Sequence, residues 1–225
     1  MFENTPTHRA AAPTTVVQRR GIARMETILA TAESLLAAQG YAAATLKGIG
    51  EHAGIPTASL YHYFTDRQQL DAELGRRHVR ALDERFAEAL NHPQVQTLRD
   101  AVDAMIEPLL TYCREHPSIV QLWFVGRSSV LRELADGFDE SWAEQLWRFL
   151  VARSLIRPDT PRFVVQLAFK VGDRIFDIAF QRSPTGDDAT IDEGFRVVTA
   201  YLETYAPPAS TRHPRNWPNR LGAGH

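Results

Sequence analysis

The sequence predicts an all-α protein. Between about residue 19 and residue 205, apolar side chains recur at the three- and four-residue intervals of amphipathic helices. No segment shows the sustained alternation of apolar and polar residues that is typical of a half-buried strand. Proline and glycine interrupt the apolar pattern often enough to divide it into separate helices. These three observations favour a bundle of helices over a fold that contains a sheet.

The composition is that of a folded globular chain. Of the 225 residues, 44% are hydrophobic and 23% are charged, which allows a substantial core. The single cysteine, Cys113, excludes an internal disulfide. Because the sequence has neither a signal-peptide stretch nor a run of about 18 apolar residues, we expect a cytoplasmic protein. The net charge of −2 provides no overall attraction to nucleic acid, so contacts with phosphate would need locally placed side chains.

The first helix is predicted to follow a flexible arm at residues 1–18. Gly40 is its expected C-terminal cap. Three arginines near its start either contact phosphate or are simply solvated: Arg19, Arg20 and Arg24. Its apolar face consists of Ile22, Met25, Ile28, Leu29, Ala32, Leu35 and Leu36.

Two short helices are predicted next, at residues 45–53 and 57–64. Thr45 suits the N-cap of the first, and Gly54 supplies a turn residue that tolerates positive φ. Two short helices joined by such a turn are typical of a helix-turn-helix unit. In the second helix, Leu60 and Phe64 are one turn apart and should pack together against the preceding helices.

The other side of this second helix is polar and small in places. Ala58, Ser59 and His62 should point away from the core, with Thr57, Tyr61 and Tyr63 at the boundary. A small residue permits close approach to a DNA major groove, and hydroxyl and imidazole groups can meet base edges or phosphates. Taken alone, the aromatic residues in this segment would also fit a hydrophobic core.

A longer helical region follows. Asp66 and Gln69 resemble a capping box at the start of a helix of about 25 residues. Further helices are predicted at about residues 97–115, 117–125, 128–155, 160–182 and 189–204, separated by prolines and by the loop SPTGDD at 183–188. The proline-containing segment 206–225 is expected to be a flexible tail.

The stretch TLKGIGEHAGIPTASLYHYFTDRQQL, preceded by AAQGYAAA, resembles the N-terminal DNA-binding domain of the tetracycline-repressor (TetR) family of transcriptional regulators. The resemblance runs from about Arg20 to Leu74, and its most specific part is AGI..ASLYHYF..R..L. It implies a DNA-binding domain at residues 19–65 and a ligand-binding and dimerisation domain at residues 66–205. It also implies a homodimer that binds double-stranded operator DNA of approximately palindromic sequence.

The resemblance further implies which residues contact DNA. Pro56 stands where similar sequences often have a serine N-cap, and Thr57 stands where a basic residue is common, so no base preference carries over. Arg67 would hold a phosphate with its forked guanidinium. The full set of implied contacts is Thr45, Lys47, Thr57, Ala58, Ser59, Tyr61, His62, Tyr63 and Arg67.

In similar proteins the C-terminal bundle encloses a small-molecule pocket, which needs apolar walls and a few polar groups. Most bulky residues in this region must form the core, and an ordinary salt bridge or a solvated position is the commoner role for each ionisable candidate. The candidate pocket residues are His78, Met105, Leu109, Tyr112, Trp123, Phe124, Arg127, Trp142, Phe169 and Asp173.

The last two predicted helices carry apolar residues that could pack internally. The resemblance implies instead that they form a four-helix dimer interface with the same pair of a second subunit. The residues in question are Phe163, Leu167, Val171, Ile175, Ile178, Ile191, Phe195, Val198 and Leu202.

We therefore expect a homodimeric repressor that a small-molecule inducer releases from operator DNA, with no cofactor and no metal. Two alternatives stay open, a small all-α enzyme and a module that binds a protein partner without a small ligand. Against an enzyme, GRSSV at residues 126–130 misses the spacing of a nucleophile elbow, and HExxH, CxxC and phosphate-loop patterns are absent. Asp173 and Asp177 share a helical face, for which ion pairs with arginine are a sufficient account.

Overall fold

The computed structural model describes residues 14–126 and 128–208. These residues form nine α-helices and one π-helix, η1, and contain no strand. The elements are α1 (Thr14–Gln39), α2 (Leu46–Ala53), α3 (Thr57–Tyr63), α4 (Arg67–Leu90), α5 (Leu98–Glu115), α6 (Pro117–Val120), η1 (Gln121–Gly126), α7 (Ser129–Ala152), α8 (Arg162–Arg182) and α9 (Asp188–Glu203). The predicted all-α fold is confirmed.

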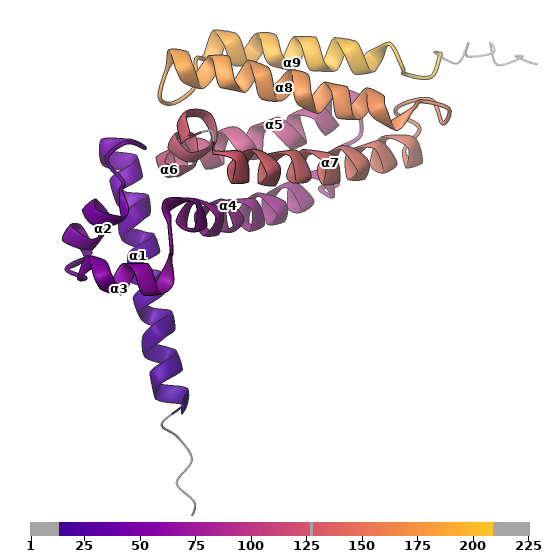
Figure 1. Ribbon diagram of the computed structural model, residues 1–225. Coiled ribbons are helices and arrows are strands. Elements are labelled where there is room, and N and C mark those ends of the chain that lie inside the picture. Colours follow the sequence, from indigo (N-terminus) through magenta and orange to yellow (C-terminus); the bar gives the residue numbers. More distant parts are fainter. Residues whose placement is uncertain (1–13, 127, 209–225) are drawn as a thin grey trace, which may run out of the picture.

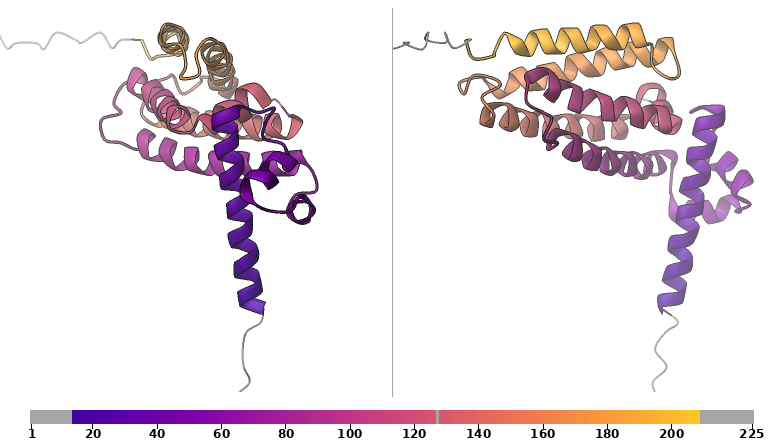
Figure 2. Two further views of the ribbon diagram at one scale, coloured as in Figure 1. Left: turned by 90° about the vertical axis from the view of Figure 1, so that its left-hand side faces the viewer. Right: turned by 180° about the vertical axis from the view of Figure 1, so that it is seen from behind.

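The helices form two groups. Helices α1, α2 and α3 lie together at one end of the molecule, and α1 extends beyond the other two (Figures 1 and 2). In the second group, α5 and α7 lie between α4 on one side and the pair α8 and α9 on the other (Figure 1). The pair α8 and α9 is therefore the outer layer of this second group.

Two hydrophobic cores correspond to these groups, and α4 belongs to both. Leu70 and Leu74, near its start, are fully buried in the core of α1–α3, whereas Leu82 and Phe86 lie in the second core. The first core also includes Leu122 of η1. The core of the N-terminal group therefore continues past residue 65, where the sequence predicted the domain to end.

The predicted helix caps around the short helices are confirmed, with one difference. The hydroxyl of Thr45 accepts the N–H of Gly48, and Gly54 has a φ of +63° at the end of α2. At the start of α4, Asp66 accepts the N–H of Gln69 at 2.9 Å. The side chain of Gln69 accepts the N–H of Thr65 at 3.0 Å, one residue before the position that a capping box requires.

Two predicted helix boundaries were wrong. Helix α1 begins at Thr14, inside the segment expected to be an arm, and the side chain of Ile22 is 54% exposed because this part of α1 lies beyond α2 and α3 (Figure 1). The single helix expected at 117–125 is a four-residue α6 followed by the π-helix η1. Residues 1–13 of the predicted arm and 209–225 of the predicted tail lie outside the described residues.

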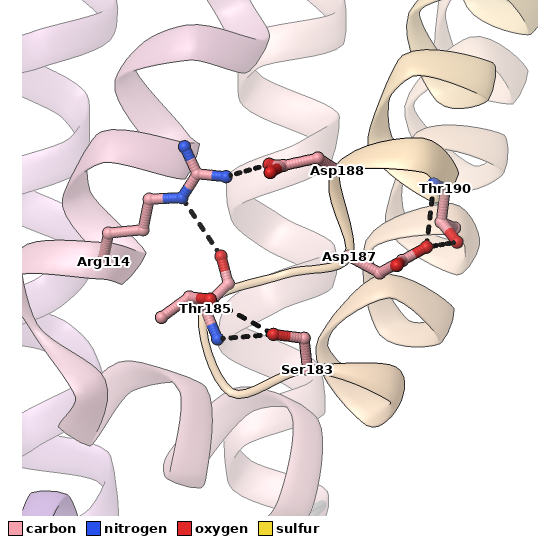
Figure 3. Close-up of polar contacts among 6 residues, drawn as sticks. All are labelled: Arg114, Ser183, Thr185, Asp187, Asp188 and Thr190. Carbon is pink, nitrogen blue, oxygen red and sulfur yellow. Dashed lines mark hydrogen bonds and ion pairs between the residues drawn. The ribbon is translucent and has the colours of Figure 1, made fainter.

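The turn between α8 and α9 is tied to α5. The guanidinium of Arg114 donates to the carbonyl of Thr185 at 3.1 Å and to the carboxylate of Asp188 at 2.6 Å (Figure 3). Asp187 caps α9 by accepting the N–H of Thr190 at 3.0 Å (Figure 3). These contacts fix the end of the outer layer against the bundle. Over the described part of the chain, no helix has the length and apolar character needed to span a membrane.

Candidate nucleic-acid interface and ligand cavity

Helix α3 is seated firmly against α2. Leu60 is fully buried and Phe64 is 5% exposed, which confirms the orientation predicted from their spacing. Gly50 of α2 permits the close approach, because a Cβ atom there would lie 2.8 Å from the carbonyl oxygen of Ile55. The inner side of α3 therefore has a fixed position, and its outer side faces away from the core.

The outer side of α3 is accessible. Ala58 and His62 are exposed, and the side chain of Tyr61 is 53% exposed. The remaining predicted contacts on this helix are partly exposed, namely Thr57, Ser59 and Tyr63. This arrangement provides hydroxyl, phenol and imidazole groups around one small residue.

The start of α2 lies beside this surface in the same helix-turn-helix unit. Thr45 is exposed, and its hydroxyl can still donate a hydrogen bond while it accepts the N–H of Gly48. The side chain of Lys47 is 80% exposed, and its closest ion pair, with Glu51, spans 3.9 Å. An ion pair this long and exposed contributes little, so Lys47 remains available to a phosphate.

The structure corrects the interpretation of Arg67. Its Nε donates to the fully buried carboxylate of Asp71 at 2.6 Å, and its guanidinium lies 4.4 Å over the ring of Tyr41. It also donates to the carbonyl of Ala44. A buried carboxylate needs a positive partner, so Arg67 is turned inward and does not present a free guanidinium to phosphate.

Tyr41 links this network to the π-helix. Its hydroxyl donates to Asp71 at 2.5 Å, and burial together with this acceptor raises the pKa of Tyr41 to about 12. Its backbone N–H donates to Oε1 of Gln121 at 3.1 Å. A Cβ atom on Gly126 would lie 2.6 Å from the ring of Tyr41. The first and last residues of η1 therefore contact the N-terminal group, a connection that no sequence pattern indicated.

The C-terminal group contains a mainly apolar, partly open cavity of about 80 Å³, lined by residues of α4, α5, α6, η1, α7, α8 and α9. Six of the predicted pocket residues line it, namely Met105, Leu109, Trp123, Phe124, Phe169 and Asp173. The sequence did not single out the other lining residues, which include Leu82, Phe86, Phe138, Asp139, Gly172 and Phe176. Leucine and phenylalanine at these positions have the spacing of ordinary core residues, so nothing distinguished them beforehand.

Three predicted pocket residues lie outside the cavity wall, and Arg127 lies outside the described residues. His78 is buried between α4, α5 and α6, where its Nδ1 is 2.8 Å from the hydroxyl of Tyr112. Burial lowers the pKa of His78 to about 4, so its imidazole is neutral near neutral pH. Trp142 packs behind Phe86 and Phe138, and its indole N–H donates to Asp83 at 2.7 Å.

Two carboxyl groups meet at the cavity wall. Asp139 of α7 is 6% exposed and accepts a hydrogen bond from Lys170 at 3.0 Å, while Lys170 also contacts Asp136 at 2.5 Å. Burial, and then the neighbouring Asp139, raise the pKa of Asp173 to about 8. The signal that could have identified Asp139 is a charge on the apolar face that carries Trp142 and Leu146. Within the described ranges, no group of three or more His, Cys, Asp or Glu residues could hold a metal ion.

The outer layer of α8 and α9 presents several apolar side chains. Phe163 is 59% exposed, Leu167 is 47% exposed and Val197 is 46% exposed. Three residues expected at a dimer interface are instead buried within their own chain, namely Ile191, Val198 and Leu202. They fill the second core because α9 packs onto α5 as well as onto α8.

Comparisons with known proteins agree with this geometry. Residues 28–74 match the model of bacterial regulatory proteins of the tetR family, and residues 97–202 match the tetracyclin repressor-like C-terminal domain. No curated protein sequence matches the chain.

Similar solved structures extend over most of the molecule. A TetR-family transcriptional regulator from Streptomyces coelicolor is 26% identical, with a TM-score of 0.61 over 81% of this chain and 99% of the other. The fatty acid degradation regulator FadR from Bacillus halodurans is 13% identical (TM-score 0.60, 77% and 97% covered). The ketosteroid transcriptional regulator KstR2 of Mycobacterium tuberculosis is 18% identical (TM-score 0.51, 82% and 96% covered). With a helix-turn-helix unit and an all-α C-terminal domain that both match, the chain belongs to the TetR family of transcriptional regulators.

Proposed function

We propose that this protein is a homodimeric transcriptional repressor that leaves a palindromic operator when a small apolar inducer binds. The observation that carries the proposal is the orientation of α3, with Leu60 and Phe64 buried and Tyr61 and His62 exposed. A helix held in this way can enter a major groove while it stays packed against the rest of the domain.

The proposed DNA contacts are made by exposed or partly exposed residues at the start of α2 and on α3. Tyr61 and His62 face base edges or the sugar-phosphate backbone, and Ala58 permits close approach. Lys47 and Thr45, at the start of α2, contact phosphate. Thr57, Ser59 and Tyr63 complete the surface. Arg67 has no place in this set, since Asp71 and Ala44 engage its guanidinium.

The proposed dimer uses the outer layer of α8 and α9. The exposed apolar side chains Phe163, Leu167 and Val197 lie on this layer, and exposed apolar patches commonly mark protein interfaces. A two-fold axis through such an interface gives two copies of α3, which suits half-sites about 34–36 Å apart on DNA.

The inducer acts through elements that belong to both cores. Leu82 and Phe86 of α4 line the cavity, while Leu70 and Leu74 of the same helix pack against α1–α3. In η1, Trp123 and Phe124 line the cavity, while Gln121 bonds to Tyr41. An inducer that binds better when α4 and η1 are displaced shifts the protein towards a state with misplaced recognition helices.

The residues that line the cavity indicate the chemistry of the inducer. The printed names of two similar structures refer to fatty acid degradation and to ketosteroids. At 13% and 18% identity these likenesses concern the fold. The mainly apolar lining of the cavity supports an apolar inducer.

The test is a selection of DNA fragments. The purified protein is incubated with fragmented genomic DNA at physiological salt, and the retained fragments are sequenced. Salt weakens binding that rests on phosphate contacts alone, so retention under these conditions reports specific sites. Enrichment of one short palindrome supports the proposal. If a folded dimer enriches no sequence, the proposal of an operator-binding repressor fails.

A further inference from the structure

We propose that the cavity takes a compact apolar molecule that carries one protonated amine, which binds between Asp139 and Asp173. This inference rests on the proposed function, because it names the chemical class of the inducer.

The shape of the cavity limits the apolar part of the ligand. At about 80 Å³, the cavity has room for several water molecules or a compact group, but not for a long chain. Aromatic rings form much of the wall, including Phe86, Trp123, Phe124 and Phe138. Such a wall suits a compact apolar group, and its π faces attract a cation.

Among the described lining residues, the ionisable side chains are acidic ones or the thiol of Cys113, and none is basic. Lys170 pairs with Asp136 and Asp139, and the carboxyl group of Asp173 lies beside that of Asp139. The next basic residue along α8, Arg174, pairs with Asp177. Asp173 makes no ion pair with any residue that the structure describes, although it lies within the cavity wall.

A ligand ammonium would supply the missing positive charge. The titratable groups among the described lining residues are Cys113, Asp139 and Asp173, with Lys170 and Asp136 behind the two carboxyl groups. Burial and the charge of Asp139 keep Asp173 protonated at neutral pH by raising its pKa to about 8. An arriving ammonium favours ionised Asp173, which then releases its proton to the solvent. A ligand carboxylate would instead face the charge of Asp139.

The test compares three probes that share one ring, namely benzylamine, benzyl alcohol and benzoate, in calorimetric titrations at neutral pH. Benzylamine should bind at least about tenfold more tightly than benzyl alcohol, because hydrogen bonds between charged groups are stronger than neutral ones. Benzoate should bind most weakly. Titrations of benzylamine in two buffers of different ionisation enthalpy should show the release of a proton.

Two variants and one control locate the effect. Asp173→Asn should remove both the preference for benzylamine and the proton release, whereas Asp159→Asn should retain them, because Asp159 is exposed and does not line the cavity. Gly172→Leu should block all three probes, since Gly172 lines the cavity and an added Cβ there meets no atom within 4 Å. Thermal melting checks that each variant is folded.

The outcomes separate this inference from the proposed function. Equal affinity for benzylamine and benzyl alcohol, or benzylamine binding that Gly172→Leu leaves unchanged, overturns the inference. Should Asp173→Asn fail to fold, the preference among probes in the unmodified protein and the Gly172→Leu result still decide it. Operator binding in the absence of any probe is measured on the same samples. If the unmodified protein does not bind the operator, the proposed repressor function is contradicted, but the conclusion about probe binding in the cavity still holds.

Discussion

The backbone N–H of Tyr41 donates a 3.1 Å hydrogen bond to Oε1 of Gln121. This bond joins the turn between α1 and α2 to the π-helix, which also carries Trp123 and Phe124 of the cavity wall. A short π-helical segment in an otherwise α-helical chain is frequently found at a functional site. Movement of η1 in response to a ligand would therefore reach Tyr41, and through it Asp71 and Arg67.

A substitution in η1 tests this connection without touching the DNA surface. Gly126→Ala places a Cβ atom 2.6 Å from the ring of Tyr41, so either the ring or η1 must move. Overpacking of this kind typically costs about 1–3 kcal/mol. We expect weaker operator binding, measured by fluorescence anisotropy, from a dimer that stays intact.

The matched control is Gly137→Ala on α7, where an added Cβ meets nothing within 4 Å. It should leave operator affinity unchanged and raise stability by roughly 0.5–1 kcal/mol, as glycine-to-alanine changes in helices commonly do. Equal operator affinities for the two glycine variants would count against the role given to η1.

The surface of α3 yields a second prediction. Tyr61→Ala removes a side chain that is 53% exposed and makes no core contact, so the fold should be unaffected. Loss of one contact to DNA should cost about 1–3 kcal/mol of binding free energy, or roughly 5- to 150-fold in operator affinity. Size-exclusion chromatography verifies the dimer. Unchanged affinity would remove Tyr61 from the interface.

Leu60, the residue before Tyr61, should behave in the opposite way. Its side chain is fully buried between α3 and the rest of the first core. Leu60→Ala should lower the free energy of unfolding by about 2–5 kcal/mol, as truncation of buried leucines does. Urea denaturation measures this loss. A stability equal to that of Tyr61→Ala would show that α3 is not anchored through Leu60.

The outer layer of α8 and α9 gives a prediction about assembly. Leu167→Glu places a charge among Phe163 and Val197, both exposed apolar residues of this layer. A charge at the centre of an apolar interface disfavours association, so light scattering should detect monomers. Ile22→Ser removes an equally exposed apolar side chain from α1 and should leave the dimer intact. A dimer that tolerates Leu167→Glu would place the interface elsewhere.

The carboxyl group of Asp173 predicts a pH dependence of stability. Its pKa is raised from 3.8 to about 8 by burial and by Asp139, with Lys170 opposing and Asp136 reinforcing the shift. Between these values the folded state binds more protons than the unfolded state, so stability falls as pH rises from about 4 to 8. Asp173→Asn should reduce this slope. The free energy of unfolding of the variant, relative to that of the unmodified protein, should therefore increase with pH.

Urea denaturation at several pH values in this window measures the effect, with Asp159→Asn as the control for loss of an exposed carboxylate remote from Asp173. A slope that Asp173→Asn leaves unchanged would mean that Asp173 is ionised in the folded protein.

The sequence was most informative where local chemistry decides the structure. Thr45, Gly54 and the pair Leu60 and Phe64 were predicted correctly because caps, turns and i, i+4 packing depend on neighbouring residues. The inward turn of Arg67 was missed, because it depends on Asp71 being buried by elements far away in the sequence. Only some of the residues that line the cavity were predicted, for the same reason. Side-chain type indicates burial, but tertiary packing decides which core residues, such as Phe169, face an empty space.

In the proposed arrangement, two copies of α3 bind one symmetric operator. Its most direct test is a footprint of the intact dimer on the DNA fragment that the selection enriches. We expect two protected half-sites related by two-fold symmetry, with centres about one helical turn, or 34–36 Å, apart. Protection of a single asymmetric site, or no protection by a folded dimer, would contradict it.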